Sequence, residues 1–296
     1  MIVYHSIDMD GWMSAALVQH FLRDTSNLVF ANYNQDEKAV EIVLREKPET
    51  LYVVDYSFKP DVFDKIIDAC GQVYWFDHHV TAIDGASEKM NALPGLRRSD
   101  GISAAGLIWE YVNKKNKRVS DLVDLVSRYD TWDFDDKNPL ECDPPKLNER
   151  ISFCQGDSVE MVGRAWELIR DVQKNKNALR NALLDGHQLL QNTLSKCDIV
   201  SKTANFGTVD GLKFAAVNVQ GLNPSYVLSR HYDVVDFAFC WHVLKNGKVK
   251  LDLRSDKTTG TDVSRLAKAW GGGGHEHAAG CTITIDEFLV ILSNKA

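Results

Sequence analysis

The sequence predicts an α/β protein in which a parallel-sheet N-terminal domain is followed by a connecting helix and a smaller α/β C-terminal domain with a mixed sheet. Over the first 80 residues, short apolar runs alternate with helix-like stretches, which is typical of βαβ units around a parallel sheet. Beyond about residue 197 the chain becomes rich in strand-like runs, and Asn246-Gly247 marks a hairpin turn. A length of 296 residues also fits two domains.

The N-terminal elements are predicted from the alternation of apolar and polar residues. The strands are expected at residues 2–4, 28–33, 51–54 and 73–76, and the helices at 11–23, 36–46 and 60–69. Residues 103–130 continue as two helices, and a polar, proline-containing stretch at 135–148 interrupts the pattern. A long helix at about 158–195 then carries apolar residues at helical spacing.

The C-terminal elements are predicted in the same way. The strand-like runs are residues 197–203, 212–219, 235–244 and 248–255, and residues 263–270 read as a helix. We therefore divide the chain into residues 1–196, which include the connecting helix at about 158–195, and residues 197–296.

Composition excludes several classes of protein. Hydrophobic residues make up 44% and charged residues 25% of the chain, which is ordinary for a soluble globular protein. No apolar run approaches the roughly 18 to 20 residues of a membrane span, and the N-terminus carries acids where a signal peptide has bases. The cysteines are far apart and form no CxxC pair, so we expect reduced thiols, no disulfides and a cytoplasmic location. They are Cys70, Cys142, Cys154, Cys197, Cys240 and Cys281.

The net charge of −7 argues against a protein that coats nucleic acid through bulk electrostatics. The charge is unevenly spread. Residues 1–150 hold 17 Lys and Arg against 26 Asp and Glu, whereas the remainder holds 17 against 15. The acidic first half is suited to binding cations, and the second half is better suited to binding an anion.

Acids and imidazoles follow three of the predicted strands, where the ligand crevice of an open parallel sheet lies. The residues are His5, Asp8 and Asp10 after the first strand, Asp55 after the third, Asp77, His78 and His79 after the fourth, and Asp130 after a later helix. Each motif alone has a structural reading. An Asp before a helix caps it, and a lone Asp at a strand end is usually structural.

The whole set is harder to explain by packing. Neighbouring residues of a strand point to opposite sides, so the pair His78-His79 is an unusual way to end a buried strand. Several buried carboxylates also cost several kcal/mol unless cations neutralise them. Two divalent metals that share a carboxylate would resolve this cost, and mixed His and carboxylate ligands suit Mn²⁺ better than Ca²⁺ or an all-oxygen Mg²⁺ site.

The C-terminal half contains a second candidate site. The run Gly271–Gly274 lies between a helix-like segment and an alanine-rich segment, unlike a linker. Glycines allow backbone N–H groups to approach an anion, and Arg254 and His275 could add positive charge. His277 could equally be a solvated bystander.

These motifs resemble one family. HSIDMDG, VVDY, FDHH and YDTW match in order the four motifs of the DHH phosphoesterases, and LRS with GGGGHEHAAG resembles their DHH-associated C-terminal domain. The resemblance spans roughly residues 1–290 and is greatest to compact two-domain members, namely nanoRNA-degrading oligoribonucleases, pAp phosphatases and relatives that act on cyclic or linear dinucleotides. The sequence departs from several of them in having two residues between His5 and Asp8 instead of three that include a proline.

The resemblance implies roles for particular residues. Residues 1–196 would be the DHH catalytic domain and residues 197–296 a substrate-binding domain. One Mn²⁺ would be held by His5, Asp8 and Asp55, and the second by Asp10, Asp55, His78 and Asp130; Mg²⁺ or Co²⁺ could replace them. Asp77 would orient a histidine, and Asp8, Asp55 and His79 would act in catalysis. The substrate phosphate would meet His79, Arg254, Ser255, Gly272, Gly273, Gly274 and His275.

The implied activity is a Mn²⁺-dependent phosphodiesterase that releases 5′-mononucleotides from short RNA or DNA oligonucleotides or linear dinucleotides by two-metal activation of water. The alternatives are a pAp phosphatase and a cyclic-dinucleotide phosphodiesterase. A family II inorganic pyrophosphatase is less favoured, because those enzymes carry a different C-terminal domain. A non-catalytic nucleotide sensor should have lost ligand residues, and every expected ligand type is present. The resemblance also allows a homodimer.

Overall fold

The computed structural model describes residues 1–22, 27–33, 36–112, 115–135, 137–152, 157–258 and 260–293. Its contacts divide the chain into two compact units. Unit 1 comprises residues 1–134 and 139–189, and unit 2 comprises residues 135–138 and 190–296. The division falls within one helix, α10 (Ala178–Ser201). The short segment 135–138 belongs with unit 2 because Lys137 forms ion pairs with Asp256 at 3.0 Å and Asp233 at 3.3 Å.

Unit 1 contains the predicted parallel sheet. Its strands are β1 (Ile2–His5), β2 (Leu28–Ala31), β3 (Thr50–Val54) and β4 (Gln72–Phe76), in the order β2-β1-β3-β4. Every pairing between them is parallel. The α/β class and the parallel N-terminal sheet are therefore confirmed, although β2 ends at Ala31, two residues before the predicted end.

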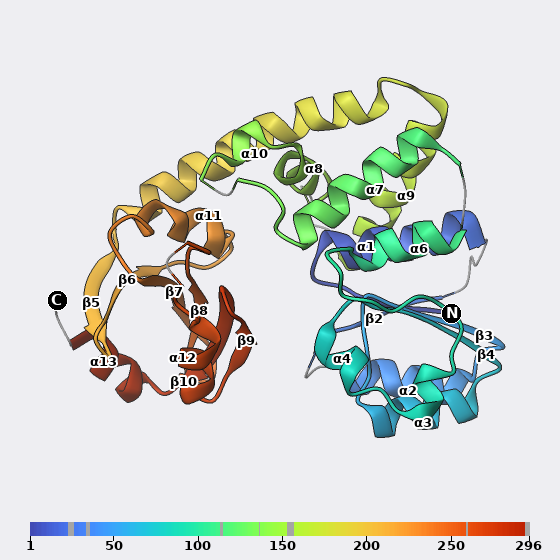
Figure 1. Ribbon diagram of the computed structural model, residues 1–296, viewed down its shortest axis with the longest axis horizontal. Helices are drawn as coiled ribbons and strands as arrows, with labels where there is room; N and C mark the ends of the chain where they lie inside the picture. Colours follow the sequence, from blue (N-terminus) through green and yellow to red (C-terminus); the bar gives the residue numbers. More distant parts are fainter. Residues whose placement is uncertain are drawn as a thin grey trace. The chain divides into compact units, whose positions relative to one another are not determined.

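Helices cover both faces of this sheet (Figure 1). One layer contains α1 (Met9–Leu17), α6 (Ala104–Val112), α7 (Lys117–Asp130), α8 (Asp143–Ser152) and α9 (Ser158–Lys174). The other contains α2 (Glu37–Glu46), α3 (Pro60–Ala69), α4 (Val80–Asp84) and α5 (Glu88–Asn91). Alternate strand residues enter the two layers, since Tyr4 and Val54 pack in the first and Val3 and Val53 in the second. Both sheet faces are therefore buried, which leaves the strand ends for polar groups.

One helix prediction needs correction. Residues 11–23 were expected as one helix, but α1 ends at Leu17 and continues as a π-helical turn, η1 (Val18–Leu22). The polar, proline-containing stretch 135–148, which interrupts the predicted pattern, contains a 3₁₀ turn, η2 (Pro139–Glu141), and the start of α8. The prolines of α8, Pro144 and Pro145, lie in its first turn, where a missing N–H breaks no helical hydrogen bond.

The prediction of a single long helix at about 158–195 is also wrong in detail. The segment forms two helices, α9 and α10 (Ala178–Ser201), because Asn175 adopts an extended conformation and its side chain accepts a hydrogen bond from the N–H of Asn177 at 2.9 Å. Such a local side-chain bond competes with the helix.

Helix α10 also takes up residues predicted to be a strand. The run 197–203 was expected to open the second sheet, but α10 reaches Ser201. Leu190, Leu194, Cys197 and Ser201 are all buried, and their spacing places them on one face of a helix. Burial of this face outweighs the strand preference of the intervening Ile199 and Val200.

Unit 2 contains the predicted mixed sheet. Its strands are β5 (Asn205–Val209), β6 (Leu212–Asn218), β7 (Phe237–Val243), β8 (Val249–Arg254), β9 (Gly273–His275) and β10 (Ala278–Ile283), in the order β5-β6-β7-β8-β10-β9. Only β6 and β7 pair in parallel. The helical segments are α11 (Pro224–Leu228), η3 (Ser229–His231), α12 (Val263–Ala269) and α13 (Ile285–Ser293). Phe237, Phe239 and Leu251 form the core together with residues of α12 and α13.

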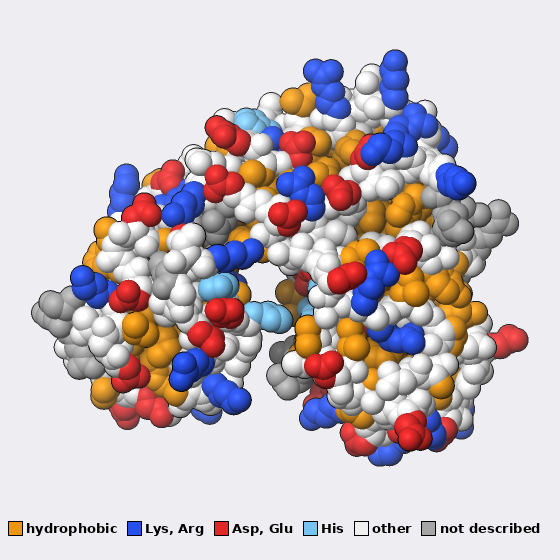
Figure 2. Space-filling view, viewed as in Figure 1, with side chains coloured by type: hydrophobic (Ala, Val, Ile, Leu, Met, Phe, Trp, Pro, Cys, Tyr) orange, Lys and Arg blue, Asp and Glu red, His pale blue; other side chains and the backbone are white. Residues whose placement is uncertain are grey.

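No helix in the described ranges is long and apolar enough to cross a membrane. Figure 2 shows that positive and negative side chains are interspersed over the face in view. Cys70, Cys240 and Cys281 carry free thiols, and the last two are buried. Cys154 lies outside the described residues.

Candidate metal centre

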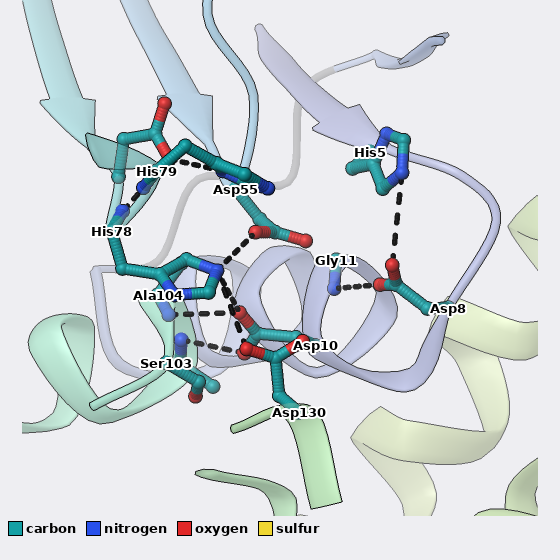
Figure 3. Close-up of polar contacts among 12 residues, drawn as sticks. His5, Asp8, Asp10, Gly11, Asp55, His78, His79, Ser103, Ala104 and Asp130 are labelled. Carbon is teal, nitrogen blue, oxygen red and sulfur yellow. Dashed lines mark hydrogen bonds and ion pairs between the residues drawn. The ribbon is translucent and has the colours of Figure 1, made fainter. Parts of the chain in front are cut away.

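The predicted site residues of unit 1 meet at the carboxyl edge of the sheet. His5 ends β1, Asp55 follows β3, and Asp77, His78 and His79 follow β4. Because these strands are neighbours and parallel, their carboxyl ends meet at one edge. Asp130, the last residue of α7, reaches the same place (Figure 3).

The turn between β1 and α1 is built by its own side chains. Asp8 caps α1 by accepting a hydrogen bond from the N–H of Gly11 at 3.1 Å. A side chain at position 11 would meet the carbonyl oxygen of His5, because a Cβ there would lie 1.9 Å from that atom. Glycine therefore lets the helix begin directly behind the strand, with Asp10 buried in its first turn.

Asp10 is held by a helix far away in the sequence. Its two carboxylate oxygens accept hydrogen bonds from the N–H groups of Ala104 at 2.8 Å and Ala105 at 2.9 Å, at the start of α6. The N-terminus of a helix favours a negative charge, so this contact fixes the carboxylate. Ala104 and Ala105 could not be identified from the sequence, since backbone donors leave no pattern of side chains.

Three carboxylates surround the Nε2 atom of His78. This atom lies 3.3 Å from Asp55 Oδ1, 3.3 Å from Asp130 Oδ2 and 3.9 Å from Asp10 Oδ2. Figure 3 shows these side chains converging from β3, α7, α1 and the segment after β4. The structure thus brings together the four residues that the resemblance assigns to the second metal.

These atoms lack ordinary hydrogen bonds. Among the described residues, the buried side-chain atoms without a hydrogen-bond partner include His78 Nε2, Asp55 Oδ1, Asp130 Oδ2 and His5 Nδ1. Two ligand atoms that share a cation at about 2.1 Å lie roughly 3 to 3.4 Å apart, which agrees with the two 3.3 Å separations. Since buried polar atoms are normally satisfied, the group fits a divalent cation.

The charges support the same conclusion. Burial first, and then the neighbouring carboxylates, raise the pKa of Asp55 and Asp130 well above the ordinary range. Burial also raises the pKa of Asp10, against the opposing effect of His78. Burial lowers the pKa of His78, which favours the neutral imidazole that a metal needs. A cation would relieve the repulsion among the acids.

The Asp77 carboxylate forms hydrogen bonds with nearby residues and does not join the carboxylates around His78 Nε2. Its Oδ1 accepts hydrogen bonds from the N–H of His78 at 2.7 Å and the N–H of His79 at 3.1 Å, and lies 2.7 Å from His79 Nδ1. The hydroxyl of Ser57 donates to Oδ2. Burial alone would raise the pKa of Asp77, but its hydrogen bonds with His79 and Ser57 lower it.

The same pairing acts on His79. Burial would lower the pKa of its imidazole, but the hydrogen bond to Asp77 and the charge of that carboxylate raise it. His79 is therefore held in one orientation and favours the protonated form, with Nε2 as its remaining donor. The Asp55, His78 and His79 side chains also form a compact group of possible ligands.

His5 and Asp8 lie on the other side of Asp55 from His78 (Figure 3). His5 Nε2 is 3.6 Å from Asp8 Oδ2, and the His5 side chain is buried. In the described part of the chain, the compact ligand groups contain neither residue. The first predicted metal set is thus less closely gathered than the second.

In unit 2, the predicted phosphate residues Arg254 and His275 share one face of the sheet. Ala278 of β10 is paired with Arg254 on β8 and with His275 on β9, so the three residues form a row across adjacent strands. Arg254 Nε donates to Ser225 Oγ at 3.1 Å, and Nη1 donates to the carbonyl of Leu253 at 2.8 Å. These bonds fix the guanidinium beside a small alanine.

Ser255 and His277 are engaged within unit 2. The Ser255 hydroxyl donates to the carbonyl of Thr261 at 2.7 Å and lies 3.0 Å from His277 Nδ1. A phosphate contact from this hydroxyl would have to replace one of these bonds. His277 supports the end of β8 instead of being a bystander.

The glycine run is an edge strand and its turn, not a free loop. A Cβ on Gly272 would lie 2.1 Å from the carbonyl oxygen of Gly280, and a Cβ on Gly274 would lie 2.5 Å from Ala279 Cα. Close packing of β9 against β10 thus requires these two glycines. A Cβ on Gly273 would meet nothing within 4 Å, so this position is open to a ligand.

The chain is similar to known proteins at low sequence identity. No protein-family profile matches the chain. An uncharacterised protein of Acanthamoeba polyphaga mimivirus is 21% identical over 297 aligned residues, covering 95% of this chain and 66% of that protein. Oligoribonuclease NrnB of Bacillus subtilis is 22% identical over 273 residues, covering 87% of this chain and 64% of that protein. The chain therefore spans slightly less than two thirds of the length of these relatives.

A solved structure shares the fold. The pGpG-specific phosphodiesterase PggH of Vibrio cholerae superposes with a TM-score of 0.62 at 14% sequence identity, over 98% of this chain and 95% of that chain. The arrangement of a parallel-sheet unit followed by a mixed-sheet unit thus occurs in a known phosphodiesterase.

Proposed function

We propose that the chain is a metal-dependent phosphodiesterase of the DHH type that hydrolyses short oligonucleotides or linear dinucleotides to 5′-mononucleotides. The observation that carries the proposal is the convergence of Asp10, Asp55 and Asp130 on the unsatisfied Nε2 atom of His78. The names of the relatives, an oligoribonuclease and a pGpG-specific phosphodiesterase, support a nucleotide phosphodiester as the substrate.

We assign two Mn²⁺ ions to this edge of the sheet. His5, Asp8 and Asp55 would hold one ion, and Asp10, Asp55, His78 and Asp130 the other. When bound, such ions activate water and neutralise charge on phosphoryl oxygens. Mixed imidazole and carboxylate ligands favour Mn²⁺ over Ca²⁺, with Mg²⁺ or Co²⁺ as substitutes.

The protein's own groups would orient the substrate. His79, held by Asp77 and favoured in its protonated form, would donate a hydrogen bond from Nε2 to a phosphate oxygen. Arg254 and His275 would bind the substrate's terminal phosphate, and Gly273 would let the backbone approach it. We assign Ser255 to supporting the end of β8.

We also propose a cytoplasmic location and a homodimeric assembly. The buried free thiols Cys240 and Cys281 agree with a reducing compartment such as the cytoplasm. A homodimer would be tested by light scattering of the purified protein.

A substrate panel tests the function. Purified protein with Mn²⁺ is incubated with pAp, cyclic dinucleotides, linear dinucleotides and oligonucleotides of RNA and DNA, and the products are separated by chromatography. We expect mononucleotides carrying a 5′-phosphate from the linear dinucleotides. Faster release of phosphate from pAp, or opening of a cyclic dinucleotide, would favour one of the alternative activities. Absence of metal-dependent hydrolysis of every compound would overturn the proposal.

The assignment of Arg254 and His275 predicts a separation of binding from metal retention. Arg254→Ala or His275→Ala should weaken use of a dinucleotide about ten-fold to one-hundred-fold, the loss of one charge-assisted phosphate contact, while metal content stays unchanged. Bis-p-nitrophenyl phosphate has no terminal phosphate and should be hydrolysed almost normally. Lys268→Ala, which removes an exposed positive charge on α12, is the control. Equal losses on both substrates would contradict the assignment.

A further inference from the structure

Tyr33 borders the candidate metal centre, although no sequence motif points to it. It lies two residues beyond the end of β2, and Ala31 at that end is paired with His5 of β1. The centroid of the Tyr33 ring is 5.6 Å from the His5 ring and 5.8 Å from the His79 ring. Tyr33 therefore adjoins both a proposed metal ligand and the histidine proposed to contact phosphate.

The Tyr33 ring is held in place. The N–H and hydroxyl of Ser6 donate to the Asn32 side-chain oxygen at 3.3 Å and 3.0 Å, which ties the turn after β1 to the turn after β2. The Tyr56 ring lies 5.0 Å from the Tyr33 ring. Burial, and then the charges of Asp77 and Asp55, raise the pKa of the Tyr33 hydroxyl.

Part of Tyr33 is nevertheless exposed to solvent. Tyr33 is 44% exposed even though three aromatic rings surround it. Ile7 is 63% exposed. It lies two residues beyond His5, just as Tyr33 lies two residues beyond Ala31, the residue paired with His5. Scattered exposed apolar residues need no explanation, but these two extend from adjacent turns that are tied together at the rim of a charged site. A partly exposed aromatic ring that is already held in place loses little conformational entropy when it binds a flat ligand.

We propose that Tyr33, with Ile7 on the adjacent turn, is a stacking platform for a nucleobase of the substrate, an inference that rests on the proposed nucleotide phosphodiesterase function. A nucleotide base is separated from its phosphate by one ribose, so a base on Tyr33 would accompany a phosphate at His79. Stacking on an aromatic ring uses the π-face that every base has, so the platform admits any base. It favours purines, whose two rings overlap the tyrosine more than one ring does.

Kinetics with base-deleted substrates test the platform. Wild type, Tyr33→Ala and Tyr33→Phe are compared on linear dinucleotides with both bases, without the 5′ base, and without the 3′ base. Stacking on an aromatic side chain contributes roughly five-fold to one-hundred-fold in affinity. We expect Tyr33→Ala to raise KM by such a factor on the intact dinucleotide, Tyr33→Phe to restore it, and the effect to vanish when the stacked base is absent.

A spectroscopic readout tests the contact without turnover. Emission of a nucleotide containing 2-aminopurine should be quenched on binding to wild type and Tyr33→Phe, but not to Tyr33→Ala. Tyr111→Ala is the matched control, because Tyr111 is 39% exposed in the same unit and packs on Tyr74 and Phe76 instead. Metal titration of each variant detects damage to His5.

The outcomes separate the two proposals. If wild type hydrolyses no dinucleotide, the proposed function fails. If wild type is active but Tyr33→Ala loses the same factor on intact and base-deleted substrates, or loses metal, the platform is overturned while the function stands. Failure of Tyr33→Phe to restore KM would also overturn it, since the ring face is retained in that variant.

Discussion

Asp55 combines burial, a raised pKa and an unusual backbone conformation in one residue. It is 1% exposed, its carboxyl pKa is raised well above the ordinary range by burial and by neighbouring acids, and its backbone has a φ of 51°. A left-handed conformation is uncommon for a residue other than glycine, although Asp and Asn tolerate it best. Strained, desolvated residues cluster at functional sites.

Asp55→Asn therefore tests the shared ligand without disturbing the backbone. Loss of a group that only supports a ligand costs about ten-fold to one-hundred-fold in metal affinity, so loss of a carboxylate shared by two ions should cost more than about 100-fold. Metal content measured by spectrometry and hydrolysis should both collapse. When a chelator has removed the metals, the variant lacks one of the buried charges that repel one another. Its unfolding midpoint should then be equal to or higher than that of metal-free wild type. Asp84→Asn, at an exposed acid, is the control, and stoichiometric metal in Asp55→Asn would contradict the assignment.

The pairing of Asp77 with His79 predicts a pH dependence. The carboxylate raises the pKa of His79, so the protonated imidazole persists to higher pH than an isolated histidine. In Asp77→Asn this support weakens, and the alkaline limb of kcat/KM should move to lower pH. Ser57→Ala removes one hydrogen bond but keeps the charge, so its shift should be smaller. An unmoved profile in Asp77→Asn would show that His79 does not act as a cation.

Among the elements, strand β9 contains one glycine that packing requires and one that it does not. Gly274 has a φ of +144° and no room for a Cβ, whereas Gly273 has open space. The three residues of β9 are nevertheless all exposed at the edge of the second sheet. The motif that reads as one glycine loop thus contains positions with different physical reasons to be glycine.

Gly274→Ala and Gly273→Ala form a matched pair. The first should destabilise unit 2 by about 1 to 3 kcal/mol, because it combines an unfavourable backbone conformation with a clash against Ala279. The second should change stability little but weaken the use of a dinucleotide. Urea unfolding and KM measured on both variants check this. Similar instability in both would argue that the whole run serves packing.

At the scale of the whole molecule, charge limits the substrate. The net charge is −7, and residues 1–150, which contain the proposed metal ligands, hold 26 acids against 17 bases. Metals would neutralise a few of these acids, whereas the remaining surface repels a polyanion. If the substrate is a nucleotide chain, as proposed, we expect each additional phosphate to add more repulsion than binding.

Activity should consequently fall as the substrate lengthens from a dinucleotide to a 20-mer. Because salt screens repulsion between exposed charges, the difference between the two lengths should shrink as ionic strength rises. Initial rates on end-labelled substrates at several salt concentrations provide the measurement. Equal rates at low salt would indicate a processive exonuclease that grips a long strand.

The alternation of elements, and the acids and imidazoles at the strand ends, could be predicted from the amino-acid sequence. Periodicity and turn residues are local properties, so His5, Asp55 and His78 could be assigned to strand ends from the chain alone. The same local reasoning failed for residues 197–203, where burial of one helical face overrode the strand preference of Ile199 and Val200.

Which side chains come into contact, and which positions remain exposed, depends on packing between segments that are distant in the sequence. The hydrogen bond from Ala104 to Asp10 joins residues 94 apart, and it uses a backbone donor that no side-chain pattern encodes. The exposed ring of Tyr33 beside His79 likewise depends on strand order, which brings the ends of β2 and β4 to one edge. Such contacts arise from packing between distant segments, so they are fixed by the fold and not by local sequence.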